Sequence, residues 1–164
     1  MFFLRAQTTE LIAETSDIAM KKKFVYKVDK CLGCKSCEIA CAVAHSTSGD
    51  LFNAVNEFGA LSSRKKVYAF SGKNYPVSCK QCDDPQCVRV CMSGALAVDP
   101  HEKNVVYDEA RCVGCWMCVM ACPYGAIKPD KKSKKAVRCD LCKDKEEPQC
   151  LKACPTKAIT RTSF

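Results

Sequence analysis

The stretch that decides the fold runs Cys112-Val-Gly-Cys115-Trp-Met-Cys118-Val-Met-Ala-Cys122-Pro123. Its cysteines follow the pattern C-x2-C-x2-C-x3-C-P, in which two-residue gaps let a tight loop turn three thiolates toward one point. A helix that begins at the third cysteine then carries the fourth about one turn further along. This pattern is typical of loops that hold iron–sulfur clusters, and the fourth cysteine of such a run binds a second cluster.

Other residues of the stretch fit this interpretation. Pro123 cannot continue a helix and disfavours helical backbone in the residue before it. We therefore expect the helix to end there and the next four residues to leave as a short strand. Gly114 is expected to let the backbone come close to cluster sulfurs, where a Cβ atom would collide. Trp116, Met117 and Tyr124 are expected to shield a cluster from water.

All sixteen cysteines of the 164-residue chain fall into four such blocks, with none left over. The blocks are, in order, Cys31, Cys34, Cys37 and Cys41; Cys79, Cys82, Cys87 and Cys91; Cys112, Cys115, Cys118 and Cys122; and Cys139, Cys142, Cys150 and Cys154. Four thiolates hold one 4Fe–4S cluster. We therefore predict four 4Fe–4S clusters as cofactors, with the sixteen cysteines as ligands to cluster iron.

Three other uses of clustered cysteines fit the sequence less well. Structural zinc sites also use C-x2-C pairs, but a third cysteine two residues after the second, followed by C-x3-C, is not their usual layout. A disulfide scaffold suits a small secreted domain, and cysteines so close in sequence seldom bridge each other without strain. A redox sensor rarely needs four clusters.

The charge balance agrees with these cofactors. The chain has a formal net charge of +8 when each cysteine is counted as neutral. An oxidised cluster with four thiolates carries about −2, so four clusters contribute about −8 and leave the loaded protein close to neutral. The basic composition therefore gives no reason to expect nucleic acid as a partner, and no basic surface interleaved with aromatic residues is evident.

Neither membrane attachment nor export is expected. No apolar run approaches the length of a membrane span. The apolar residues 1–4 are followed at once by Arg5, so they do not develop into a signal peptide. The sequence also contains no twin-arginine pair. We therefore expect a cytoplasmic protein, and its many oxidation-sensitive thiolates favour an anaerobic host.

An internal repeat indicates the fold class. Phe24-Val-Tyr-Lys-Val-Asp-Lys-Cys31-Leu-Gly-Cys34 aligns without a gap on Val105-Val-Tyr-Asp-Glu-Ala-Arg-Cys112-Val-Gly-Cys115, and both predict a strand, a turn and a cluster loop. A strand is predicted again after the later blocks, at 94–98, 125–128 and 157–160. The pattern is the half-module of a bacterial-type ferredoxin used four times, which predicts an α+β fold. Spacing alone permits block two to pair with block three, or block three with block four.

Two segments lie outside the repeat. Residues 1–23 are expected to be a flexible N-terminal extension. The interruption 42–78 contains Leu51, Phe52 and Val55 at helical spacing, with Phe58 one turn further on. This spacing predicts a helix. The helix is expected to cover its own domain or, alternatively, to dock a partner protein.

The basic and histidine residues receive minor roles. The lysine-rich tract 128–138 is expected to be a solvated hairpin tip. Lys35, Lys80 and Arg89 lie near cysteines in sequence and are expected to tune cluster potentials. His45 and His101 are expected to be structural or surface residues, because sixteen cysteines already supply every ligand.

Taken together, the four blocks resemble the four-cluster iron–sulfur subunits of the dimethyl sulfoxide reductase, formate dehydrogenase and hydrogenase type, over residues 24–160. Within that family, 31–45 and 112–127 look most like the ferredoxin-like subunit of anaerobic carbon monoxide dehydrogenase. The resemblance implies two bacterial-ferredoxin-like domains with two clusters each. Blocks one and four would form domain A, from residues 24–41 and 128–164. Blocks two and three would form domain B, from residues 79–127.

The ligand pattern of the family implies how the cysteines are shared. Site I would be held by Cys31, Cys34, Cys37 and Cys154, and site II by Cys41, Cys139, Cys142 and Cys150. Site III would be held by Cys79, Cys82, Cys87 and Cys122, and site IV by Cys91, Cys112, Cys115 and Cys118. Ala42 and Met92 stand where simple ferredoxins have proline after the fourth cysteine, which weakens the predicted helix stop in blocks one and two.

These features predict an electron-transfer protein with no catalytic residues, since the sequence has no dinucleotide fingerprint, phosphate loop or nucleophilic constellation. The resemblance implies that it relays electrons from the catalytic subunit of carbon monoxide dehydrogenase to a hydrogenase or a flavin-dependent pyridine nucleotide oxidoreductase. A first alternative keeps the relay but places it in a formate dehydrogenase, hydrogenase or molybdenum reductase. A second alternative, of another class, is a zinc-stabilised interaction module.

Overall fold

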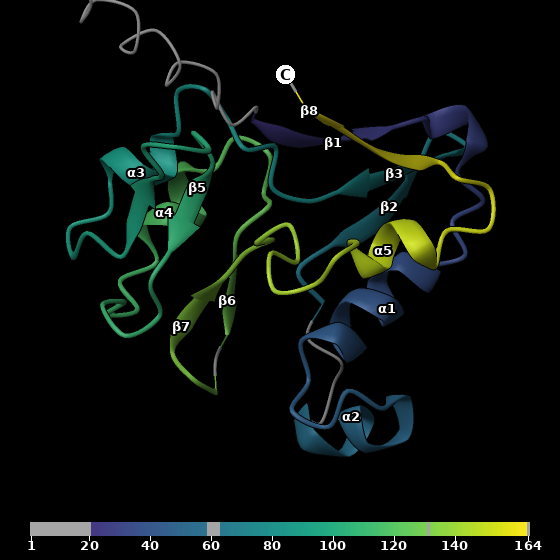
Figure 1. Ribbon diagram of the computed structural model, residues 1–164, viewed down its shortest axis with the longest axis horizontal. Helices are drawn as coiled ribbons and strands as arrows, with labels where there is room; N and C mark the ends of the chain where they lie inside the picture. The colour runs from purple at the N-terminus through teal and green to yellow at the C-terminus, as the bar shows by residue number, and fades with distance from the viewer. Residues whose placement is uncertain (1–20, 59–62, 131, 164) are drawn as a thin grey trace, which may run out of the picture.

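The computed structural model of the chain describes residues 21–58, 63–130 and 132–163. Within these residues the chain forms short helices and two-stranded antiparallel sheets, in agreement with the predicted α+β class (Figure 1). Residues 1–20 of the predicted extension lie outside the described residues, and its last two residues belong to strand β1 (Lys22–Tyr26). No helix among the described residues has the length and apolar character needed to cross a membrane.

The first group of elements comes from both ends of the described chain. Strand β1 pairs antiparallel with β8 (Ile159–Ser163), and a short 3-10 helix, η1 (Val28–Lys30), follows β1. Helix α1 (Ser36–Ala44) contacts α5 (Gln149–Lys152). We call this group the β1–β8 unit. It joins elements of blocks one and four.

The second group comes from the middle of the chain. Strand β4 (Leu96–Val98) pairs antiparallel with β5 (Val105–Tyr107). Helix α3 (Gln86–Arg89) contacts α4 (Met117–Ala121). We call this group the β4–β5 unit. It joins elements of blocks two and three and lies across the molecule from the β1–β8 unit (Figure 1).

Each block starts a helix one residue before its third cysteine, so the predicted helix start is confirmed to within one residue. The four helices begin at Ser36, Gln86, Met117 and Gln149. In blocks one and three, Lys35 and Trp116 enter the helix through left-handed backbone, with φ of 60° and 61°. In blocks two and four, Pro85 and Pro148 precede the helix instead. Two kinds of local backbone restriction therefore produce the same turn.

Two hairpins fill the segments between the blocks. Strands β2 (Lys66–Phe70) and β3 (Lys73–Val77) form a hairpin within the interruption 42–78, and β6 (Lys128–Asp130) and β7 (Lys135–Val137) form one within the lysine-rich tract. Val67 of β2 packs in the core that contains Phe24 and Ile159 of the β1–β8 unit. Ala136 of β7 packs instead with Leu96 and Val105 of the β4–β5 unit. The β6–β7 hairpin thus packs on the β4–β5 unit, whereas the resemblance implied that residues 128–164 belong to domain A.

The interruption also contains the predicted helix, α2 (Leu51–Phe58). Its Ala54 is buried, but Leu51, Phe52 and Val55 keep 42%, 80% and 47% of their surface exposed. The helix is therefore confirmed. The expectation that these large apolar side chains cover their own domain is confirmed only in part, because Leu51 and Val55 are about half buried while Phe52 is open to solvent.

The strand expected directly after Pro123 begins later than predicted. The N–H of Gly125 donates to the carbonyl of Cys122 at 3.2 Å, and the N–H of Ala126 donates to the sulfur of Cys122 at 3.4 Å. These bonds close a turn, and β6 begins only at Lys128. The strands predicted after blocks two and four are confirmed as β4 and β8.

The role of Gly114 also differs from the expected one. Its φ is +69°, and a Cβ atom there would collide with the backbone carbonyl oxygen of Lys134 in the β6–β7 hairpin. At the equivalent Gly33, also with φ +69°, a Cβ atom would lie 2.6 Å from the side-chain oxygen of Asn74 in the β2–β3 hairpin. Gly114 is therefore required by the backbone of the hairpin that closes over its loop, whereas at Gly33 the contact is with a side chain of the covering hairpin.

Gly114→Ala is expected to destabilise the loaded protein more than Gly94→Ala does. Both glycines have positive φ, at 69° and 65°, which costs a residue with a Cβ about 1–2 kcal/mol. Nothing lies within 4 Å of a Cβ at Gly94, whereas at Gly114 the hairpin backbone must also shift. Anaerobic thermal denaturation of both variants measures the difference. Equal losses would show that the hairpin contact contributes nothing.

Candidate functional site

The sixteen cysteines all lie among the described residues, and none of them forms a disulfide. The structure brings the four cysteines of site I together around one small cavity, which Val67 and Pro76 of the β2–β3 hairpin also line. The four cysteines of site IV surround a second small cavity. In both cavities three cysteines come from one block and the fourth comes from another. Each of these two cavities is therefore surrounded by cysteines from two different blocks of the sequence.

The cysteines of site III influence one another electrostatically. Burial is the main reason why the pKa of Cys87 is raised to about 11. The thiols of Cys79, Cys122 and Cys82 add to the increase, and Arg138 opposes it. The four thiols of this predicted set are thus close in space.

The cysteines of site II are the most deeply placed. All four are buried. Burial raises the pKa of Cys139 to about 12, and the thiols of Cys41 and Cys150 contribute to the increase. Burial also raises the pKa of Cys142, again with a contribution from Cys41. Cys41 of block one therefore lies among the cysteines of block four.

These thiols form a donor set that fits a metal cluster. A thiol with a pKa of 11 or 12 keeps its proton at neutral pH unless another positive charge takes the place of that proton. Bonds to metal ions supply such a charge, because the ligand is the thiolate. Groups of four converging thiols suit the iron of 4Fe–4S clusters.

In three blocks the sulfur of the fourth cysteine accepts a hydrogen bond from a backbone N–H. The donors and acceptors are Leu96 N–H to Cys91 Sγ at 3.4 Å, Ala126 N–H to Cys122 Sγ at 3.4 Å, and Ala158 N–H to Cys154 Sγ at 3.3 Å. In each case the chain turns back on the sulfur directly after the cysteine. Hydrogen bonds to cluster sulfurs are one of the factors that set reduction potentials.

Aromatic shielding is only partly as predicted. Trp116 lines the cavity of site IV together with Tyr107 and Leu96. Met117 and Tyr124 keep 45% and 49% of their surface exposed. The residues that lead into α4 thus turn Trp116 toward the cysteines, whereas Met117 and Tyr124 are about half exposed.

Lys65, which sequence reasoning missed, is a buried cation beside cysteines. Its side chain is only 1% exposed, and its ammonium donates to the hydroxyl of Tyr26 at 3.1 Å. The same ammonium lies 5.0 Å from the ring centre of Phe24 and 4.5 Å from that of Tyr26. It opposes the increase that burial causes in the pKa of Cys37 and Cys150. Positive charge therefore lies inside the β1–β8 unit, near sites I and II.

Arg138 is a second buried cation. Its Nη2 donates to the sulfur of Cys79 at 3.3 Å, and its Nη1 donates to the carbonyl of Val105 at 2.8 Å. The predicted solvated hairpin tip is therefore wrong at Arg138, because the chain after β7 turns inward toward Cys139. It is also wrong at Lys128 and Lys135, which are partly buried and whose ammonium groups donate to the carbonyls of Ser63 and Cys112. Lys132 and Lys134 of the same tract are exposed, as expected.

The basic residues that the sequence suggested would tune cluster potentials are not the two buried cations. Lys35 and Arg89 are exposed, and Arg89 forms an ion pair with Asp84 at 2.5 Å. The ammonium of Lys80 lies 4.8 Å from the ring centre of Tyr26. Proximity to a cysteine in sequence was therefore a poor guide to which cation is buried.

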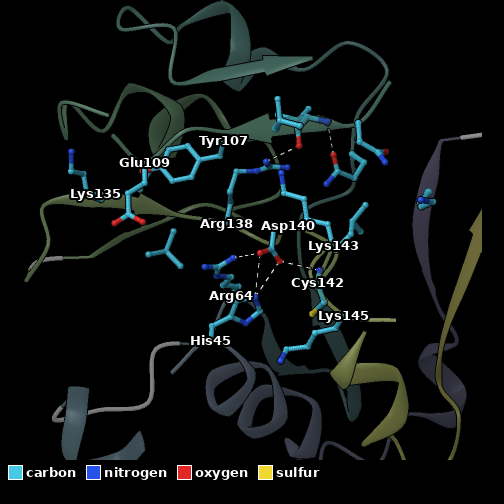
Figure 2. A pocket seen from close by; sticks show the side chains of 18 of the residues that line it. His45, Arg64, Tyr107, Glu109, Lys135, Arg138, Asp140, Cys142, Lys143 and Lys145 are labelled. Carbon is cyan, nitrogen blue, oxygen red and sulfur yellow. Dashed lines mark hydrogen bonds and ion pairs between the residues drawn. The ribbon is translucent and has the colours of Figure 1, made fainter. Parts of the chain in front are cut away.

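Asp140, between the first two cysteines of block four, collects donors from three segments (Figure 2). Arg64 of the interruption 42–78 and the His45 ring, at 3.2 Å, bind its carboxylate, as does the N–H of Cys142 at 3.0 Å. His45 Nδ1 also lies 2.7 Å from the carbonyl of Cys41. These groups border a polar cavity of about 770 Å³ that both units line. His45 thus has the structural role predicted for it, and His101 is exposed.

The same contacts keep the network charged. Burial disfavours protonation of His45, but hydrogen bonds with Asp140 and Cys41 outweigh this and raise its pKa to about 9. Burial also opposes ionisation of Asp140, yet His45 and Arg64 hold its pKa well below the usual range. At neutral pH the group therefore links α1, the interruption and block four through opposite charges.

Comparison with known proteins bears on the cofactor. Residues 71–163 match the family described as 4Fe-4S dicluster domain. The chain belongs to this family. An iron–sulfur protein of Rhodospirillum rubrum is 40% identical over 147 residues, which cover 80% of this chain and 76% of the relative. Electron transport protein HydN of Escherichia coli (strain K12) is 33% identical over 160 residues, which cover 85% and 87%.

A further relative belongs to an enzyme complex by name. It is a subunit of the anaerobic dimethyl sulfoxide reductase of Escherichia coli (strain K12), and it is 32% identical over 151 residues, which cover 83% of this chain and 70% of the relative. The predicted resemblance to iron–sulfur electron-transfer subunits is thereby confirmed. This member of the 4Fe-4S dicluster family binds 4Fe–4S clusters and is an electron relay, not a catalytic enzyme.

One solved structure shares the fold of this dicluster protein. It is the active site complex BamBC of benzoyl coenzyme A reductase as isolated, with a TM-score of 0.50 at 22% identity. The match covers 88% of this chain and 78% of the other. The likeness concerns the fold alone.

Asp140→Asn is expected to lower the thermal midpoint of the loaded protein, because His45 and Arg64 lose their counter-ion in a partly buried place. The expected cost is about 2 kcal/mol, typical of hydrogen bonds to charged groups. Asp29→Asn is the matched control, since it removes an ion pair with Lys73 in which both side chains are mostly exposed. The control should leave the midpoint almost unchanged. Anaerobic thermal denaturation that finds no difference between the variants would contradict the structural role of the network.

Proposed function

We propose that the chain relays single electrons through four 4Fe–4S clusters as the electron-transfer subunit of a formate dehydrogenase, hydrogenase or molybdenum reductase. The observation that carries the proposal is the convergence of cysteines from different blocks on common cavities. When bound, a 4Fe–4S cluster accepts and releases one electron at a time. The relative named as part of a dimethyl sulfoxide reductase supports assembly with a catalytic subunit.

We further propose two bacterial-ferredoxin-like domains with two clusters each. Domain A holds sites I and II, which the pairing of β1 with β8 and the contact of α1 with α5 support. Domain B holds sites III and IV, which the pairing of β4 with β5 and the contact of α3 with α4 support. We assign the β6–β7 hairpin to domain B, because the ammonium of Lys135 donates to the carbonyl of Cys112.

The burial of the ligands supports an order for the relay. Cys34 of site I and Cys115 of site IV are exposed, whereas every cysteine of site II is buried. Cys79 of site III is also buried, and it accepts a hydrogen bond from Arg138, the residue before Cys139 of site II. The outer positions in this order are sites I and IV, where electrons enter and leave. Sites II and III carry the electron between the domains.

The interruption 42–78 is a proposed docking element for the catalytic partner. Phe52, on the outer face of α2, is 80% exposed, and the neighbouring Leu51 and Val55 are about half exposed. Large exposed apolar side chains gathered on one helix are typical of an interaction surface. The β2–β3 hairpin connects this element with site I, since its Val67 and Pro76 line the cavity of that site.

The choice of partner follows the names of the relatives. They include a subunit of a dimethyl sulfoxide reductase and an electron transport protein, and they favour this assignment over carbon monoxide dehydrogenase. The carbon monoxide dehydrogenase partner therefore stays a prediction from the sequence. So does transfer onward to a hydrogenase or a flavin-dependent pyridine nucleotide oxidoreductase.

Cys122→Ser is expected to damage site III and spare site IV, although the other three cysteines of its block belong to site IV. Electron paramagnetic resonance of the reduced protein identifies the cluster that is lost. The wild type should contain about sixteen irons with matching acid-labile sulfide, and the variant about one cluster less. Cys115→Ser, in the same block, is the matched control and should damage site IV.

Two outcomes of this experiment would contradict the proposal at different levels. If Cys122→Ser and Cys115→Ser lose the same cluster, the crossed partition is wrong while the relay stands. If the wild type contains about four zinc ions and no sulfide, the zinc-stabilised interaction module is correct and the relay is wrong.

Anaerobic affinity purification of the chain from its native host tests the partner. A formate dehydrogenase, hydrogenase or molybdenum reductase catalytic subunit is expected in comparable amount. A carbon monoxide dehydrogenase catalytic subunit would reverse the choice of partner and keep the relay. Recovery of the loaded chain alone would contradict its role as a subunit.

A further inference from the structure

We propose that Arg138 raises the reduction potential of site III, at the place where the two units meet. The inference rests on the proposed function, in which Cys79 is a ligand of site III. Arg138 is a positioning residue, since it acts on the cluster through the sulfur of Cys79 and is not itself a ligand. Sequence reasoning assigned it to a solvated hairpin tip.

Two hydrogen bonds hold the guanidinium of Arg138 in place. Nη2 donates to Cys79 Sγ at 3.3 Å, and Nη1 donates to the carbonyl of Val105 at 2.8 Å. The side-chain oxygen of the buried Gln81, in the same loop as Cys79, accepts a hydrogen bond from the N–H of Val105 at 2.8 Å. The loop and the guanidinium are therefore tied to one residue of β5. Movement of Arg138 away from Cys79 would break a buried hydrogen bond.

The charge of Arg138 favours the reduced form of a cluster at Cys79. A 4Fe–4S cluster with four thiolates changes from about −2 to about −3 when it takes up one electron. A guanidinium stays protonated in proteins, so its positive charge is permanent. Arg138 is only 3% exposed, and the interaction is therefore screened less than one at the surface. The hydrogen bond to sulfur acts in the same direction, because it draws negative charge away from the cluster.

The position of Arg138 in the chain gives this effect a place in the relay. It follows β7, which packs on the β4–β5 unit, and it immediately precedes Cys139, a proposed ligand of site II. Cys79 packs in the same core cluster as Cys139. Sites II and III therefore approach each other beside Arg138. A higher potential makes site III a better electron acceptor than it would be without Arg138.

Arg89 offers a matched comparison within the same site. It lies on α3, two residues after Cys87 of site III, and carries the same charge. Its side chain is 63% exposed, and its guanidinium is already paired with Asp84. Solvent and the carboxylate both weaken its field. Arg89 is therefore the closer of the two arginines in sequence to a proposed ligand of site III, yet only Arg138 is buried and contacts a ligand sulfur.

The test is a redox titration of the loaded full-length chain, followed by electron paramagnetic resonance, in Arg138→Gln, Arg138→Lys and Arg89→Gln. In Arg138→Gln one of the four potentials should fall by an amount that corresponds to about a tenfold smaller reduction equilibrium constant, or about 59 mV. In Arg138→Lys the same potential should fall less, because an amine keeps the charge but lacks the planar fork. Arg89→Gln should leave all four potentials at their wild-type values.

Iron content and one ligand variant separate this inference from the proposed function. Wild type with about sixteen irons and four potentials, one of which disappears in Cys82→Ser, upholds the partition and identifies site III. Unchanged potentials in a fully loaded Arg138→Gln would then overturn the inference alone, as would a shift at a site other than III. If Arg138→Gln does not retain its iron, a fully loaded Arg138→Lys with wild-type potentials overturns it.

Discussion

The structure depends on holding thiols in places where burial opposes their ionisation. Burial raises the pKa of Cys139 to about 12 and that of Cys37 to about 11. Such groups become thiolates only when a positive charge replaces the proton. Cysteines also make up much of the two small apolar cores, so the surface that stabilises the fold is the surface that surrounds the metal ligands. Packing and cluster binding are therefore parts of one folding equilibrium.

The two hairpins solve the same problem with different residues. The loops that begin at Cys31 and Cys112 repeat each other in sequence, and each is closed by a hairpin inserted elsewhere in the chain. Asn74 of β2–β3 donates to the carbonyl of Cys31 at 3.2 Å, and Lys135 of β6–β7 donates to that of Cys112. A glycine lies under each hairpin, beside the side chain of Asn74 in one and the backbone carbonyl of Lys134 in the other. The repeat thus extends to segments in which the sequences themselves do not align.

Local spacing made the ligand blocks and helix starts predictable, because a helix that begins beside the third cysteine follows from covalent geometry alone. The buried cations were not predictable in this way. A basic residue precedes the first cysteine in three blocks, as Lys30, Arg111 and Arg138, yet only Arg138 is buried. The difference arises because the chain after β7 turns Arg138 inward against Val105 and Cys79, which is a property of tertiary packing. Likewise, the helical spacing in 51–58 predicted α2 but gave no information on whether its apolar face has a neighbour.

This distinction changes the meaning of the net charge. Counted over the whole chain, +8 merely balances the charge expected of four clusters. Exposed lysines of the β6–β7 turn contribute to that sum but act through water, which screens them. Lys65 and Arg138 contribute only two of the positive charges, yet both are buried beside cysteines and their fields are far less screened. The total charge therefore fits the cofactors as a set. The contribution of cations to the differences in reduction potential between clusters depends instead on which few of them the fold buries.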